Sequence, residues 1–162
     1  MSMTACLMTL PEAELNSLLQ NPDTIKNVIE KGEATIFDLD KSWHGIHFLL
    51  TGSAQGGEEP LCYLIEGGHA VGDIDVGSGP ARALKPDQVA AFDAALNKIT
   101  EKEFRTRFNP EKMRQAEIYP SIWDRPAEED DSLQYLVEYL SDLKTFVREA
   151  KEHKQGILVW LS

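Results

Sequence analysis

Residues 131–161, DSLQYLVEYLSDLKTFVREAKEHKQGILVWL, decide the fold, because they join a long amphipathic helix to a short apolar strand. Gly156 ends the helical pattern, and the uninterrupted run ILVWL predicts a buried strand at this end of the chain. Apolar residues spaced by three and four lie on one face of a helix over about residues 131–153: Leu133, Leu136, Val137, Leu140, Leu143, Val147 and Ala150.

The other end of the chain carries a second apolar run, MTACLMTL, at residues 3–10, and this run predicts another buried strand. Thr9 and Glu12 have the T-x-x-E spacing of a capping box, so we expect Thr9 to cap a helix that ends near Asn21. A second short helix is expected to end at Gly32 in a left-handed cap. The run LCYLI at residues 61–65 is a short buried strand or helix, which periodicity does not resolve.

Between the two terminal strands the sequence is mostly helical. Helices are expected from Pro86, behind a T-x-x-E pattern at Thr100, and behind Asn109, which resembles an N-cap followed by a first-turn proline. Strands at both ends with helices between them indicate an α+β domain, in which the first and last strands pair in one small sheet. With 162 residues, no internal repeat and no long linker, we expect a single domain over residues 1–162.

The composition narrows the classes of partner. The chain has 16 Lys and Arg against 27 Asp and Glu, a net charge of -11, which disfavours nucleic acid and anionic membranes and leaves a basic protein as an open partner class. The sequence has no apolar segment long enough to span a membrane and no signal-peptide pattern. Cys6 and Cys62 lie among apolar neighbours, so we expect reduced core thiols and a cytoplasmic protein, although spacing alone leaves a disulfide open.

The segment WHGIHFLLTG, at residues 43–52, combines a helical apolar stripe with two histidines. Trp43 and His47 lie in that stripe and His44 lies nearer its edge, with Asp40 as the expected N-cap. His44, His47 and Asp40 could together approach a metal ion, but zinc needs three or four matched ligands. We therefore expect no metal and no cofactor, and we favour core packing for His47.

The glycine-rich segment 67–82 raises two further possibilities. Asp73 and Asp75 are spaced like the front of a calcium loop, but the glutamate that such a loop requires at its twelfth position is Leu84 here. Gly77, Ser78, Gly79 and Arg82 have the composition of an anion site, since backbone amides and a guanidinium suit phosphate or carboxylate. The favoured interpretation is structural: the aspartates hydrogen-bond turn amides, and Arg82 pairs with an acidic side chain.

Over nearly its whole length the chain resembles the YfbM-like family of bacterial proteins, a domain of unknown function. The resemblance implies a single α+β domain in the bacterial cytosol and carries over no activity, cofactor or catalytic set. The residues on which it rests are Asp40, Lys41, Trp43, His44 and His47, then Gly67-Gly68, Gly79-Pro80-Ala81-Arg82, Tyr119-Pro120 and Trp123.

These observations yield two classes of function. The first is a non-catalytic module that binds a small molecule or a protein partner. The second is a small hydrolase or transferase with His44 or His47 as general base. No complete reactive constellation is present in the sequence, so we favour the first, and no residue is assigned as catalytic. The ligand cleft is expected to form where six residues converge: Trp43, His44, His47, Arg82, Tyr119 and Trp123.

Overall fold

A single antiparallel sheet organises the computed structural model, which describes residues 2–126 and 128–162. Its strand order is β2-β1-β5-β4-β3. The strands are β1 (Ala5–Leu10), β2 (Phe37–Asp38), β3 (His69–Ala70), β4 (Arg82–Leu84) and β5 (Gly156–Leu161).

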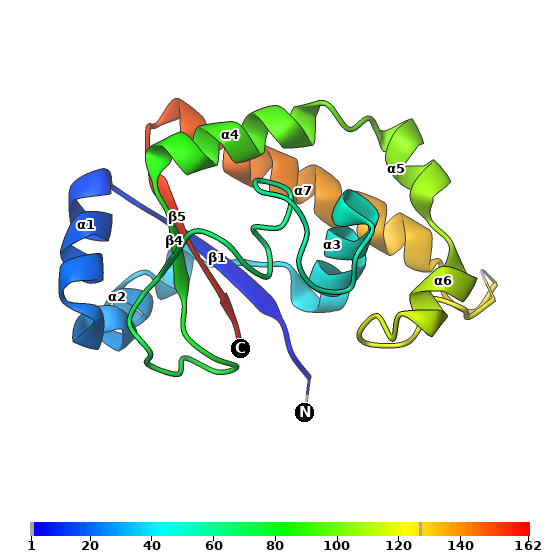
Figure 1. Cartoon of the computed structure of the whole chain (residues 1–162), viewed down its shortest axis with the longest axis horizontal. Coiled ribbons are helices and arrows are strands. Elements are labelled where there is room, and N and C mark those ends of the chain that lie inside the picture. The colour runs from blue at the N-terminus through cyan, green and yellow to red at the C-terminus, as the bar shows by residue number, and fades with distance from the viewer. Residues whose placement is uncertain (1, 127) are drawn as a thin grey trace.

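The two ends of the chain form the centre of this sheet (Figure 1). β1 and β5 pair along their whole length, from Ala5 opposite Leu161 to Leu10 opposite Gly156. The expectation that the first and last strands pair in one small sheet is therefore confirmed, and with it the α+β fold class.

β1 and β5 are apolar at nearly every position, and successive side chains of a strand point to opposite faces. Both faces of the sheet are therefore buried under helices. Ala5 and Leu7 belong to the core on one face, whereas Cys6 and Met8 belong to the core on the other. Helices α1 (Glu12–Gln20) and α2 (Ile25–Lys31) cover the second face. Helices α3 (Trp43–Thr51), α4 (Pro86–Asn97) and α7 (Ser132–Glu152) lie over the first, so the molecule has three layers (Figure 1).

Side-chain caps define several helix starts as the sequence predicts. Thr100 accepts a hydrogen bond from the Glu103 amide at 3.1 Å and begins α5 (Glu101–Arg107). Asn109 accepts one from the Lys112 amide at 3.1 Å and begins α6 (Pro110–Gln115). Asp131, for which no cap was predicted, caps α7 in the same way.

Three local expectations are wrong. Thr9 remains in β1, and α1 begins at Glu12 without a side-chain cap. Gly32 follows α2 with a φ of -94°, so it does not adopt the left-handed conformation. Residues 61–65 are neither strand nor helix but consecutive turns, in which the amides of Ile65 and Glu66 both donate to the Cys62 carbonyl.

Cys6 and Cys62 are both free and buried, in agreement with the expectation of reduced core thiols. Across the described residues, no helix has the length and apolarity that crossing a bilayer demands.

Candidate functional site

Helix α3 carries the two histidines and lies between the sheet and the loop that follows it. Its residues Trp43, Ile46, His47 and Leu50 are buried, which confirms the predicted stripe. The expected N-cap is wrong, since α3 begins after a 3-10 turn, Asp40–Ser42, and Asp40 instead accepts a hydrogen bond from the Tyr135 hydroxyl at 2.7 Å.

His44 joins three segments of the chain. Its Nε2 lies 2.8 Å from the Ala54 carbonyl oxygen, and its Nδ1 accepts a hydrogen bond from the Tyr119 amide at 2.9 Å. This geometry assigns a neutral ring with the proton on Nε2. Burial also lowers the pKa of His44, which favours the same neutral form. Neither ring nitrogen is free for proton transfer or for a metal.

Trp43 and Tyr119 connect His44 to the N-terminal segment of the chain. The indole ring stacks on His44 with centroids 5.0 Å apart and on Tyr119 at 5.7 Å. The indole Nε1 donates to the Met3 carbonyl at 3.0 Å, while the Met3 amide donates to the Tyr119 hydroxyl at 2.7 Å. Both aromatic side chains therefore have their polar atoms satisfied by the backbone or by donors within the fold.

His47 lies one turn beyond Trp43 and is fully buried. Its Nε2 is 3.3 Å from the Thr51 hydroxyl, and its Nδ1 has no hydrogen-bond partner among the described residues. Burial is the main cause that lowers the pKa of His47 to about 4, so the ring is neutral at neutral pH. A solvent-borne substrate has no access to this ring, and a general-base role for either histidine would require the present packing to break.

Arg82 lies on β4 on the side of the sheet that faces α3. Its Nη1 donates to the Gly67 carbonyl at 3.2 Å. Arg82 forms no close ion pair among the described residues, but the nearby Glu66 charge acts to raise its pKa, so the expected acidic partner acts only at longer range. Burial lowers the pKa of Arg82 to about 10, a value that leaves it cationic at neutral pH. Its charge also helps to lower the pKa of His47, which places the two residues in the same region.

The neighbouring glycines are needed for the same closure. Gly68 has a φ of 72°, and a Cβ at this position would lie 2.7 Å from the Ala83 carbonyl oxygen. The loop therefore reaches β4 only because residue 68 has no side chain. This contact accounts for Gly68 in physical terms without a ligand.

The backbone amides of the predicted anion site at residues 77–79 are already hydrogen-bonded within the protein. The Asp75 carboxylate accepts hydrogen bonds from the Gly77 amide at 2.9 Å and the Gly79 amide at 3.0 Å, and these bonds lower the pKa of Asp75. The Ser78 amide donates to the Leu161 carbonyl. The structural interpretation of this turn is confirmed, and the anion-binding alternative is wrong for these three amides. Within the described part of the chain, no three His, Cys, Asp or Glu side chains gather to hold a metal ion.

A recess of about 320 Å3 opens beside the first turn of α3. Its charged group is Glu66, whose side chain is exposed and forms no close ion pair among the described residues, although its charge interacts with that of Arg82. The lining residues are Trp43, His44, Ala54, Gln55, Ile65, Glu66 and Leu161, and we call this cavity the α3 recess.

The predicted residues converge only in part. Trp43 and His44 line the α3 recess. Tyr119 does not line it, but its ring stacks on Trp43 and its amide donates to His44. Neither His47 nor Arg82 is among its lining residues. Trp123 packs on the opposite side of α3 against Gly45, where it donates from its Nε1 to the Ile118 carbonyl at 3.0 Å. The α3 recess is therefore lined by two of the six predicted residues, Trp43 and His44.

Five lining residues were not predicted from the sequence: Ala54, Gln55, Ile65, Glu66 and Leu161. No local pattern marks them, because they come from a loop, a turn and the last strand, which meet only in the folded chain. The glycine pair that follows Glu66 was the nearest available signal.

Comparisons with known proteins agree with this structure. The family model described as a domain of unknown function (DUF1877) matches residues 1–160. Protein YfbM of Escherichia coli (strain K12) is 27% identical to the chain over an alignment that covers 75% of each. The crystal structure of a protein of unknown function, YfbM from Escherichia coli, superposes with a TM-score of 0.79 at 21% identity and covers 98% of this chain and 99% of that one. The chain therefore belongs to the DUF1877 family, the YfbM-like proteins of unknown function.

Proposed function

We propose that this protein is a non-catalytic module that binds a small organic cation in the α3 recess. The observation that carries the proposal is the exposed Glu66 carboxylate beside the Trp43 and His44 rings in a concave surface. A carboxylate and an aromatic wall together suit an ammonium or guanidinium group. The net charge of -11 favours the approach of a cation in the same way.

The state of the histidines supports a binding role over catalysis. His44 uses both ring nitrogens in hydrogen bonds, and His47 is sealed from solvent. A hydrolase or transferase with either histidine as general base needs a free nitrogen within reach of its substrate. The two reduced, buried cysteines favour a cytoplasmic location, which is part of the same proposal.

A thermal-shift screen tests this function directly. The probes are small amines, quaternary ammonium compounds and guanidinium compounds that fit a cavity of about 320 Å3. A ligand at one hundred times its Kd stabilises the native state by about 2.7 kcal/mol. For a domain of this size, that corresponds to a rise in Tm of about 5–10 °C.

Two variants make the screen specific. We expect Glu66→Ala to abolish the shift, while Glu58→Ala, an exposed glutamate of the same loop that does not line the recess, retains it. If no cation shifts the wild type, or if the shift survives in Glu66→Ala, the proposed site is wrong.

A second candidate is a basic protein partner, and the distribution of ion pairs favours it. Among the described residues, ion pairs engage Glu101, Glu111, Asp130 and Asp93, so most of the 27 acidic residues have no cationic partner. Such a complex is expected to weaken as salt rises. Co-purification from the native host that is unchanged between low and high salt would exclude binding through these charges.

A further inference from the structure

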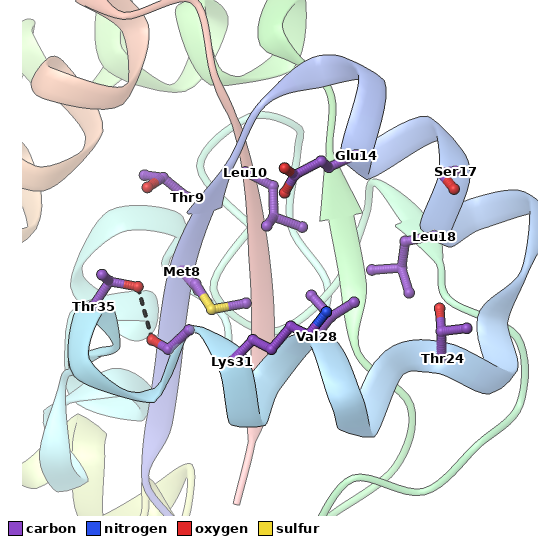
Figure 2. Close-up of a pocket in the computed structure, with 11 residues that line it drawn as sticks. Met8, Thr9, Leu10, Glu14, Ser17, Leu18, Thr24, Val28, Lys31 and Thr35 are labelled. Atoms are coloured by element: carbon purple, nitrogen blue, oxygen red, sulfur yellow. Dashed lines mark hydrogen bonds between the residues drawn. The ribbon is translucent and has the colours of Figure 1, made fainter.

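A second cavity lies on the face of the sheet opposite α3. Helices α1 and α2 cover this face, and the groove between them and β1 has a volume of about 470 Å3. We call it the α1–α2 groove. Its size falls within the range of about 300–1,000 Å3 that is typical of small-molecule sites. Its floor is apolar and consists of Met8 and Leu10 from β1, Leu18 from α1 and Val28 from α2 (Figure 2).

Two side chains of opposite charge line this groove. Glu14 extends from α1 and Lys31 from α2, and Figure 2 shows them on opposite sides of the groove with the apolar side chains between them. Both residues are exposed, and neither forms an ion pair among the described residues. The groove therefore offers one carboxylate and one ammonium group, each free to meet a charge on a ligand.

Threonine hydroxyls in the lining add hydrogen-bond acceptors to the groove. The Thr24 hydroxyl donates to the Asn21 carbonyl at 2.8 Å. The Thr35 hydroxyl donates to the Gly32 carbonyl at 2.7 Å (Figure 2). A hydroxyl has one proton and two acceptor lone pairs, so both groups can still accept a hydrogen bond. They suit the ammonium group of a ligand, whereas the carboxylate of a ligand needs the donors of Lys31.

A zwitterion matches both charges of the groove at once. A ligand with only a positive charge would bind Glu14 but bring a like charge toward Lys31, and a ligand with only a negative charge would do the reverse. The net charge of -11 draws cations to the whole surface, so Lys31 is the feature that adds a site for a carboxylate. A free amino acid or dipeptide carries an ammonium and a carboxylate group on a short backbone, and its apolar side chains can cover the floor.

We propose that the α1–α2 groove binds a free apolar amino acid or dipeptide in its zwitterionic form. Glu14 binds the ammonium group and Lys31 binds the carboxylate, while the side chains of the ligand pack on the apolar floor. Amino acids and dipeptides share this chemistry and differ in length. The groove and the α3 recess lie on opposite faces of the sheet, so the proposal does not depend on the function proposed for that recess.

Titration of the protein with L-leucine and with L-leucyl-L-leucine tests the proposal and distinguishes the two ligand lengths. Isotope-labelled methionine methyl groups report the binding by NMR, because Met8 lies on the floor of the groove. Met113 is an internal control, since it is buried in the core on the opposite face of the sheet. We expect a saturable shift of the Met8 signal and no shift of the Met113 signal, and the probe with the lower Kd identifies the ligand length.

Derivatives of leucine test the two charges separately on the wild-type protein. N-acetyl-L-leucine lacks the positive charge, and L-leucinamide lacks the negative charge. At about pH 6.5 the terminal amines of leucine and leucinamide remain protonated. We expect each derivative to bind with a Kd about fivefold higher than that of leucine, as for the loss of one exposed charge pair.

Protein variants assign each charge to its partner. Glu14→Gln should weaken leucine and leucinamide by about fivefold without weakening N-acetyl-leucine. Lys31→Gln should weaken leucine and N-acetyl-leucine without weakening leucinamide. Glu12→Gln and Lys26→Gln remove exposed charges from the same two helices outside the groove, so they should leave all three Kd values unchanged.

Three results would overturn the proposal: a Met8 signal that does not shift with either probe at millimolar concentration, equal Kd values for leucine and both derivatives, or equal effects of Glu14→Gln on all three ligands. The comparison of derivatives uses the wild-type protein, so it holds even if a variant does not fold. Binding of leucine that Glu66→Ala abolishes and Glu14→Gln preserves would assign the amino acid to the α3 recess and would also refute the groove site.

Discussion

Replacement of His44 by phenylalanine should destabilise the fold by about 1.5–4.5 kcal/mol. The aromatic ring can keep its stacking on Trp43, whose centroid lies 5.0 Å from that of His44, so the change mainly removes two hydrogen bonds. Loss of the acceptor for the half-buried Tyr119 amide costs about 1–3 kcal/mol because that donor becomes unsatisfied. Loss of the donor to Ala54 adds about 0.5–1.5 kcal/mol.

Urea denaturation followed by tryptophan fluorescence measures this free energy, and a thermal melt should show a decrease of about 6–12 °C for a loss of 3 kcal/mol. The matched control is His69→Phe, which places the same ring at an exposed position. Equal stabilities for His44→Phe and the wild type would refute the conclusion that His44 is a structural joint. A catalytic role for this residue would then become open again.

Three further changes test other parts of the structure. The pKa of His47 is about 4 in the fold against 6.5 when exposed, so the unfolded state binds a proton first as pH falls below about 6.5, and His47 thereby lowers the stability of the fold by about 2 kcal/mol at pH 5. The variant His47→Leu should lack this pH-dependent loss of stability. If urea titrations at pH 7.5 and pH 5 show the same loss of free energy in both proteins, the buried neutral ring is contradicted. Gly45→Ala should cost about 1–3 kcal/mol, since the new Cβ would lie 2.9 Å from Leu136 Cδ2, and an unchanged Tm would show that the α3–α7 contact is looser than described. Asn109→Ala should cost about 1 kcal/mol through the lost cap of α6, whereas Asn97→Ala, at an exposed helix end, should cost less in the same melt.

Local patterns in the sequence were sufficient for most elements of the fold. Each of these elements depends only on residues close together in the sequence. They are the apolar stripe of α7, the caps at Thr100 and Asn109, and the apolar runs of β1 and β5. Local reasoning failed at Thr9, where a capping-box spacing was present but the strand pairing with β5 held the residue extended. Pairing of β1 with β5 through Leu10 overrode local preference at that position.

By itself, the sequence determined the α+β class, the pairing partners at the two chain ends, the burial of the α3 stripe and the acidic character of the protein. Only the tertiary structure decided the roles of the unusual residues. His44 and Tyr119 are 75 positions apart, and the turn amides at residues 77–79 are satisfied by Asp75 and by the last strand. A side chain's chemistry depends on which partners occupy its donors and acceptors, and those partners come from segments that periodicity cannot bring together. The same reason hid the α3 recess, because a cavity exists only where separate elements meet.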